Sequence, residues 1–353
     1  MMRSGPGVRN SITDVAGVLV GHHQALDAEV TLGTGAATGC TVVRVPGGAT
    51  ASVDVRGGGP GTRETDLLDP ANTVRQLNAV LLTGGSAYGL AAADGVMRWS
   101  EEHREGIPMD PADPSRVVPI VPGAVIFDLP VGDWGIRPDP DFGYRAAAAA
   151  ATEFARGTAG AGVGARAGAI KGGIGSASVV LADGPGAGVT VGAVIVANPV
   201  GSVVDPRTGL PWGVGTDGPD FFGLRHATPD EIAALAALPA KSMVLNTTIG
   251  VIATDAALDP AGCRRLAATG HDGLARAIRP VHSPLDGDTL FALSTGAIEV
   301  APLALPPAFP TDLLLLDQLC TAAAVVVERA VVDAVLAATS IAGIPAYYDL
   351  FPR

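Results

Sequence analysis

Short apolar runs bounded by glycines recur along the chain and predict a series of β-strands. Apolar and β-branched runs between Gly, Pro, Asn or Asp are typical of strands. Two of the runs flank the turn Asp183-Gly184-Pro185-Gly186 and form a predicted hairpin. The predicted strands lie at 17–20, 41–45, 51–55, 79–83, 117–127, 176–181, 189–197 and 289–300.

Helix start signals stand between these runs. Residues 228–231, Thr-Pro-Asp-Glu, form a capping box with proline at the first helical position, and Asp259-Pro260 repeats the signal before a helix predicted to end near residue 278. The polar, Gly- and Pro-rich segment 199–224 is an expected loop. The order of elements predicts one layered α+β domain over residues 1–353, with sheet packed on sheet and helices outside. Further helices are predicted at 86–104, 144–154 and 311–339.

The composition allows a large core and argues against one class of partner. Apolar residues make up 48% of the chain, aromatic residues only 4%, and 47 residues are glycine. Such a composition predicts close packing of small side chains and many tight turns. The net charge is −12 and no basic run occurs. Nucleic acid is therefore not an expected partner.

The cysteines, the histidines and the N-terminal residues argue against disulfides, metals and membranes. Cys40, Cys263 and Cys320 have no paired spacing, which fits reduced thiols in the cytoplasm. The histidines lack the spacing of a metal site, and the first residues lack the apolar core of a signal peptide. The longest apolar helical run, 313–327, contains Asp317 and is too short to cross a bilayer. We expect a cytoplasmic protein with no metal and no membrane partner.

An amide and two hydroxyls interrupt an apolar run that predicts a buried strand. Asn246, Thr247 and Thr248 stand between the apolar residues 243–245 and 251–253. The local sequence favours a strand whose polar groups bond to neighbouring backbone, since each would cost about 1–3 kcal/mol if left unpaired. The alternative is a self-cleavage junction, because a cut before Thr247 would give a hydroxyl nucleophile with its own amine as base. Glycosylation at the Asn246 sequon is not expected in this apolar setting.

Two carboxylates stand close together in Asp286-Gly287-Asp288. In an extended segment, residues two apart point the same way, so the pair can hold an ammonium or orient a general base. The simpler interpretation is an Asp-Gly turn that leads into the strand predicted from residue 289.

Lys171 and Asn198 are the remaining candidates. Lys171 lies in the glycine-rich run 162–173, which loosely matches a dinucleotide-binding pattern. Glycines at 172, 173 and 175 exclude the helix that such a site needs, so no cofactor is expected and one cation among glycines remains. Asn198 ends an apolar strand, where its amide can donate to an oxyanion or can begin a turn before Pro199.

Taken together, several runs resemble the D-aminopeptidase A and β-peptidyl aminopeptidase family of self-processing hydrolases. The nylon-oligomer (aminohexanoate-oligomer) hydrolase branch is the nearer match, because that branch uses threonine as nucleophile where the peptidyl aminopeptidases use serine. The resemblance extends from about residue 10 to residue 350. Its motifs are residues 10–15, 56–66, 82–89, 168–173 and 246–250.

The resemblance implies a four-layer αββα sandwich with two central sheets and outer helices. It also implies cleavage between Asn246 and Thr247, giving an α chain 1–246 and a β chain 247–353, and a homotetramer of such αβ units. The matching catalytic residues are Thr247, Lys171, Asn198, Asp286 and Asp288. Phe127 stands where the peptidase branch has an active-site tyrosine, so that hydroxyl is missing here.

The implied function is an autoprocessing amidohydrolase that works through an acyl-enzyme. Its expected substrates are small amides or peptides with a free amino end: short peptides, β-peptides or ω-amino-acid oligomers. An alternative is an acyltransferase related to ornithine acetyltransferase, which also cleaves itself before threonine; the Lys-Gly-Ala/Val-Gly-Met run of that family is absent before Thr247. A non-catalytic scaffold with the same fold is a third possibility, which the retained site residues argue against.

Overall fold

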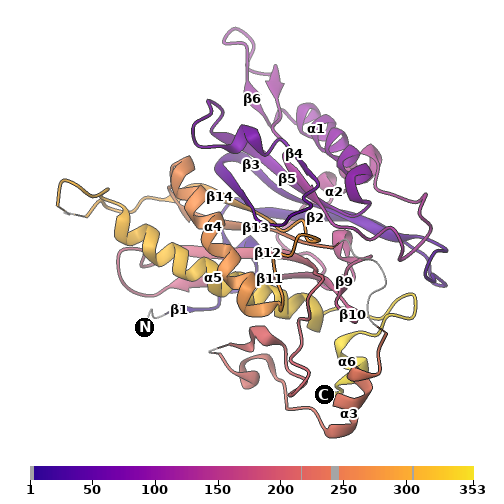
Figure 1. The fold of residues 1–353 in the computed structure, drawn as a ribbon. Helices are drawn as coiled ribbons and strands as arrows, with labels where there is room; N and C mark the ends of the chain where they lie inside the picture. Colours follow the sequence, from indigo (N-terminus) through magenta and orange to yellow (C-terminus); the bar gives the residue numbers. More distant parts are fainter. Residues whose placement is uncertain (1–3, 216, 240–245, 304–305) are drawn as a thin grey trace.

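Two β-sheets packed face to face form the centre of the fold, and helices cover the outer face of each (Figure 1). The computed structural model describes residues 4–215, 217–239, 246–303 and 306–353. Among the described residues, hydrogen bonds join nine strands along one path with a tenth beside it, and the long strand β3 (Ala37–Val55) belongs to both sheets.

The first sheet has the order β1-β11-β12-β13-β14 and ends with residues 50–55 of β3. Strands β11 and β12 form the predicted hairpin, β12 pairs antiparallel with β13, and β13 runs parallel to β14. The bounds are β1 Ser4–Gly5, β11 Gly173–Leu181, β12 Thr190–Asn198, β13 Thr247–Ala256 and β14 Thr289–Ile298.

The second sheet contains the first half of β3 with β2, β5, β8 and β4. The predicted strands 41–45 and 51–55 are one continuous strand here, so their prediction as two separate strands is wrong. The pairing of β3 with β5 shifts register between Arg44 and Ala49. Such an irregularity bends a strand and lets β3 pass from one sheet into the other. The bounds are β2 Leu19–Leu26, β4 Thr62–Arg63, β5 Gln76–Thr83 and β8 Gly123–Val125.

Alternation along each strand supplies a central core and two outer cores. Val80 of β5 packs into the same central cluster as Val194 of β12, whereas Leu81 faces an outer cluster that includes Val96 of the helix α1 (Ala92–Glu102). Successive side chains of a strand point to opposite faces, so strands buried on both sides need the nearly continuous apolar runs seen in the sequence.

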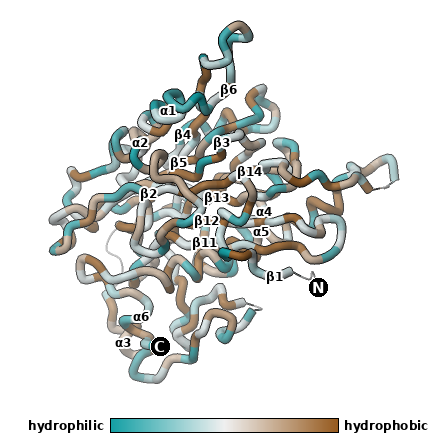
Figure 2. Tube along the Cα trace, turned by 180° about the vertical axis from the view of Figure 1, so that it is seen from behind, coloured by the Kyte–Doolittle hydropathy of each residue, from teal (hydrophilic) through white to brown (hydrophobic). Residues whose placement is uncertain are grey.

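Two pairs of helices complete the four predicted layers. Helices α4 (Pro260–Ala277) and α5 (Leu313–Leu336) pack together against the first sheet, and α1 packs with α2 (Pro140–Ala148) against the second. In Figure 2 hydrophobic segments run through the central strands, while hydrophilic segments mark the periphery near α1. The capping box at Thr228 and the cap at Asp259 are confirmed at the starts of α3 (Pro229–Ala236) and α4.

Several predicted boundaries differ from the structure. The predicted strand 117–127 is two short strands, and the predicted helix 86–104 begins as a 3-10 turn before α1. The helix predicted at 144–154 is α2, which is capped by Asp139, starts at Pro140 and ends at Ala148. The remaining elements are β6 Ile107–Pro108, β7 Val117–Val118, β9 Arg166–Ala167, β10 Ile170–Lys171, α6 Tyr347–Leu350 and the 3-10 turns η1 Ile12–Asp14, η2 Asp66–Leu68, η3 Ser86–Ala91, η4 Gly160–Gly162, η5 Trp212–Val214 and η6 Pro219–Phe222.

Candidate active site

The predicted site residues meet at one end of the first sheet. Strands β11, β13 and β14 begin at this end, and β12, which is antiparallel to β11 and β13, finishes there. In register, Thr247 pairs with Asn198, and Asn246 forms a parallel bridge with Asp286. One residue, Gly172, separates Lys171 from the start of β11. The order of the strands, rather than proximity in sequence, brings these residues together.

Thr247 begins β13 and is almost completely buried, with 4% of its surface exposed. Its hydroxyl donates to the carbonyl oxygen of Asn246, and the Gly287 N–H donates to the same oxygen at 3.1 Å. The neighbouring hydroxyl of Thr248 is buried without a hydrogen-bond partner in the described part of the chain. The apolar residues 243–245, which belong to the run that predicts this strand, lie outside the described residues.

Asp286 and Asp288 are both about 1% exposed, and each is held by its own set of donors. Asp286 accepts from the Val200 N–H at 3.1 Å and from the N–H and hydroxyl of Ser283 at 3.1 and 2.7 Å. Burial raises the pKa of the Asp286 carboxyl, and the like charge of Asp288 raises it further. The Asp-Gly-Asp segment is therefore a buried carboxylate pair as well as the lead into β14.

The Asp288 carboxylate joins the nucleophile strand to a histidine. One of its oxygens accepts from the Thr248 N–H at 2.7 Å, and the other accepts from the His282 N–H and Nδ1 at 3.1 and 2.8 Å. Asp288 thus contacts the residue that follows Thr247.

Lys171 is fully buried on β10, and its ammonium donates to the carbonyl oxygens of Gly162 and Gly172, each at 2.8 Å. Asp128 is also fully enclosed and accepts from the Gly85 N–H at 2.6 Å and the Thr38 hydroxyl at 2.7 Å. Burial raises the pKa of Asp128 to about 6, while its hydrogen bonds and the charge of Lys171 act in the opposite direction.

Asn198 links the end of β12 to the second sheet. Its side-chain oxygen accepts from the Arg166 N–H at 2.9 Å, and Arg166 is the residue paired with Lys171 in the β9–β10 hairpin. Its amide nitrogen donates to the Phe127 carbonyl at 3.3 Å. Phe127 therefore lies beside the site, and its ring makes an edge contact with Trp134.

A run of glycines after the end of β3 lets this segment approach the acidic loop. A Cβ at Gly57 would lie 2.3 Å from the carbonyl oxygen of Asp286, and one at Gly58 would lie 2.6 Å from Pro284. The Gly59 N–H donates to the Asp286 carbonyl at 2.8 Å. The motif at residues 56–66 is thus explained by close backbone approach.

Sequence reasoning missed three supporting residues: His282, Ser283 and Asp128. His282 and Ser283 are sequence neighbours of the acidic pair, but ordinary polar residues in a loop carry no signal of their partners. Asp128 had a weak signal, because a charged residue directly follows an apolar strand.

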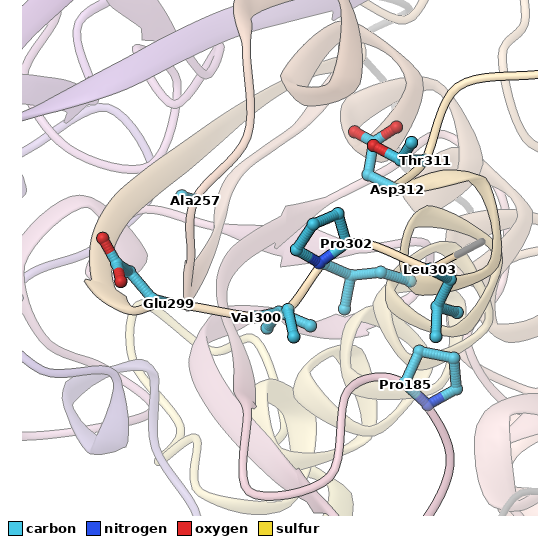
Figure 3. A pocket seen from close by; sticks show the side chains of 10 residues that line it. Pro185, Ala257, Glu299, Val300, Pro302, Leu303, Thr311 and Asp312 are labelled. Carbon is cyan, nitrogen blue, oxygen red and sulfur yellow. The ribbon is translucent and has the colours of Figure 1, made fainter.

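The cavity drawn in Figure 3 lies away from this cluster. It measures about 510 Å³ and is lined by residues that follow the far ends of the same strands, among them Ala257 after β13 and Glu299 after β14. Since a ten-residue strand is about 30 Å long, this cavity is not part of the Thr247 site. Within the described ranges, no group of His, Cys, Asp or Glu side chains could hold a metal ion, and no helix is long and apolar enough to cross a membrane.

The four layers are shared with a solved aminopeptidase from Ochrobactrum anthropi whose structure is described as a variant of the Ntn hydrolase fold, and the family that matches is one of peptidases, enzymes that act on amide bonds. The chain belongs to Peptidase family S58, whose sequence profile matches residues 10–347. The resemblance to the D-aminopeptidase A and β-peptidyl aminopeptidase family and the four-layer fold are both confirmed.

Individual relatives agree with this assignment. The chain is 60% identical over 348 residues to an uncharacterized aminopeptidase of Mycobacterium tuberculosis, covering 97% of this chain and 98% of that one. It is 34% identical over 274 residues to a 6-aminohexanoate-oligomer endohydrolase of Paenarthrobacter ureafaciens, covering 74% and 71%. The solved structure of a Burkholderia sp. beta-aminopeptidase superposes with a TM-score of 0.70 at 26% identity, covering 99% of this chain and 94% of that one.

Proposed function

We propose that the chain is a precursor that cleaves itself between Asn246 and Thr247 and then hydrolyses small amides with Thr247 as its N-terminal nucleophile. The observation that carries the proposal is the environment of the Asn246 carbonyl. The Thr247 hydroxyl points at this group, and the Gly287 N–H already donates to its oxygen. Nucleophile and oxyanion donor therefore flank the same peptide bond before it breaks.

Self-cleavage would proceed through an ester. The Thr247 Oγ attacks the Asn246 carbonyl carbon, and negative charge develops on the oxygen that faces the Gly287 N–H. The C–N bond then breaks, the Thr247 nitrogen takes a proton to become an amine, and the acyl group rests on Oγ. Water opens this ester and leaves a carboxylate on Asn246. The products are an α chain 1–246 and a β chain 247–353 within a single folded domain.

In the mature enzyme the new α-amine would act as the general base. An α-amine titrates close to neutral pH, so it can take the Oγ proton as Oγ attacks the substrate carbonyl. The amine then returns this proton to the leaving nitrogen, and water hydrolyses the acyl-enzyme. Asn198, level with Thr247 on the neighbouring strand, would donate its amide N–H to the oxyanion.

The acidic pair and Lys171 would set the charge around that amine. Asp288 accepts a hydrogen bond from the Thr248 N–H, one residue from the amine, and would orient that amine. Asp286, whose pKa is raised by burial, would support Asp288 or contact a substrate ammonium. Lys171 is buried among backbone carbonyls near Asn198 and would stabilise the negative charge that develops in the transition state.

The substrates that this site supports are short peptides, β-peptides or ω-amino-acid oligomers with a free amino end. The support is the similarity to a 6-aminohexanoate-oligomer endohydrolase and to a beta-aminopeptidase. Phe127 offers no hydroxyl to the oxyanion, so catalysis here would depend on Asn198 and backbone N–H groups. The cytoplasmic location and the homotetramer of αβ units stay predictions; light scattering of the cleaved protein tests the second.

Activity assays with matched variants test this proposal. An aminohexanoate oligomer and an aminoacyl p-nitroanilide are offered to the wild type, to Thr247→Ala and to Thr248→Val, with and without an acyl acceptor. We expect acceptor-independent hydrolysis by the wild type and by Thr248→Val, and none by Thr247→Ala. Release that requires the acceptor would favour the acyltransferase alternative, and equal activity of Thr247→Ala would exclude Thr247 as nucleophile.

A further inference from the structure

We propose that His282 is a positioning residue of this site, which holds the Asp288 carboxylate in the orientation that its work beside Thr247 requires. The inference rests on the proposed function, because it assigns a role to a residue that supports the acidic pair. It adds a residue that neither the sequence motifs nor the expected catalytic set contains.

The contacts of His282 with Asp288 are specific to one carboxylate oxygen. Both the backbone N–H and Nδ1 of His282 bond to Oδ2, at 3.1 and 2.8 Å. The other oxygen, Oδ1, is thereby left to the Thr248 N–H at 2.7 Å. Because an ionised carboxylate only accepts hydrogen bonds, Nδ1 must carry the proton in this pair. Two donors on one oxygen fix the rotation of the carboxylate, and the Thr248 contact depends on that rotation.

The backbone of His282 adopts an unfavourable conformation to make these contacts. Its φ is +55°, in the left-handed region that non-glycine residues seldom occupy. Such a conformation persists where the surroundings impose it. At His282 it turns the N–H and the ring toward the same oxygen of Asp288. The following residue, Ser283, binds one oxygen of Asp286 in the same way through its N–H and hydroxyl.

The imidazole ring of His282 also contacts a second histidine. The Nε2 atom of His282 is buried without a hydrogen-bond partner among the described residues, and its ring makes an edge contact with His271 of α4 at 4.8 Å between centroids. His271 bonds to the Asp54 carbonyl at 3.1 Å, and burial lowers the pKa of His271 to about 4, so this neighbour is uncharged near neutral pH. The ring is thus locked between a neutral histidine and Asp288.

Two substitutions separate the donor from the backbone conformation. Asn and Gly both tolerate a positive φ, so neither His282→Asn nor His282→Gly should disturb the loop. The amide nitrogen of asparagine can occupy a position close to that of Nδ1, whereas glycine retains only the backbone N–H. If His282 served only to shape the loop, the two variants would have the same kcat.

The experiment follows self-cleavage by intact mass and aminoacyl p-nitroanilide turnover in wild type, His282→Asn and His282→Gly, with thermal unfolding as a check of folding. We expect His282→Gly to lose about 10- to 100-fold in kcat, the scale typical of removing a partner that orients an active-site ligand, with KM changed little. We expect His282→Asn to recover most of that loss, and added imidazole to restore activity to the glycine variant only. Equal rates for the two variants would overturn the proposal.

One measurement is independent of activity and of whether the variants fold. In the wild type, ¹⁵N-edited NMR should show a protonated Nδ1 on His282 with a slowly exchanging, hydrogen-bonded proton. An unprotonated Nδ1 would overturn the proposal. A wild type that stays uncleaved and inactive while showing this proton would instead overturn the proposed function and leave the His282–Asp288 contact established.

Discussion

The two sheets are built alike inside, but they finish differently. Both feed alternate apolar residues into the central core and into an outer core beneath two helices. In the first sheet the strand ends carry buried polar and charged side chains that bond to one another across strands. In the second sheet the segment after β8 gives this site a backbone group, the Phe127 carbonyl, while the buried acid Asp128 bonds to Thr38 and to the Gly85 N–H.

This difference indicates where the molecule departs from simple core packing. Buried polar groups cost free energy unless each is paired, so a concentrated group of them needs strands whose register supplies the partners. The first sheet provides that register through β12, β13 and β14. The second sheet acts as the wall that closes the site.

The largest expected effect is a loss of turnover, which should follow a substitution at a strand end of the first sheet but not at one of the second. Asn198→Ala should lower kcat by about 10²–10³-fold, since one oxyanion donor contributes roughly 3–4 kcal/mol. Thr83→Val removes a buried hydroxyl at the end of β5, where it donates to the Gly84 carbonyl at 3.1 Å, and should cost about 1 kcal/mol of stability without loss of turnover. Steady-state kinetics and denaturant unfolding measure both; a similar loss of turnover in the two variants would contradict the distinction.

The close backbone approach between the glycine run 57–59 and the acidic loop gives the next largest effect, which is on the rate of self-cleavage. A Cβ at Gly287 would lie 2.8 Å from the Thr247 hydroxyl and 2.8 Å from the Gly59 carbonyl, whereas one at Gly59 would have nothing nearer than 3.8 Å. Gly287→Ala should impose about 1–3 kcal/mol of strain and slow self-cleavage by about 10- to 100-fold. Gly59→Ala is the control and should cleave at the wild-type rate, which a time course of intact mass will show.

The buried acid of the second sheet should affect stability in a defined pH window. Because burial raises the pKa of Asp128 to about 6 from an ordinary 3.8, the folded state binds its proton more tightly than the unfolded chain. The resulting cost, about 3 kcal/mol at most, is absent below pH 3.8 and grows as pH rises to 6.

Asp128→Asn removes that cost and should raise the free energy of unfolding at pH 7 by about 1–3 kcal/mol, with the gain fading toward pH 4. Urea unfolding at both values tests this. A variant that is less stable at pH 7 would show that the charge of Asp128 is needed, with Lys171 as its partner.

The smallest expected effect belongs to the outer surface of the second sheet. Arg63 of β4 and Asp94 of α1 form an ion pair at 2.6 Å, in which the Asp94 side chain is 64% exposed. Asp94→Asn should change stability by about 0.5 kcal/mol or less and leave turnover unaltered. A marked fall in activity would mean that the wall formed by the second sheet is more closely coupled to Thr247 than its contacts indicate.

Much of this arrangement could be predicted from the chain, because some signals are local. Proline and acidic caps define where α3 and α4 begin, and polar residues in apolar surroundings identify Thr247, Asn198 and Lys171. Family resemblance then adds the layer order.

The remaining features depend on contacts between distant segments. The continuity of β3 through residues 46–48 is decided by pairing with β5 and β14, not by the glycines themselves. Asp286 bonds to Val200, which is 86 residues away in the chain. The positive φ of His282 is imposed by its two bonds to Asp288, six residues further along the chain. Such features become visible only once the register of the first sheet is known.

The intact mass of the purified protein tests the central claim most directly. After prolonged incubation the wild type should give two fragments, 1–246 and 247–353, with threonine at the new N-terminus, and Thr248→Val should do the same. Thr247→Ala should remain one chain. A wild type that stays full length, or a Thr247→Ala variant that is cut at the same bond, would contradict the account.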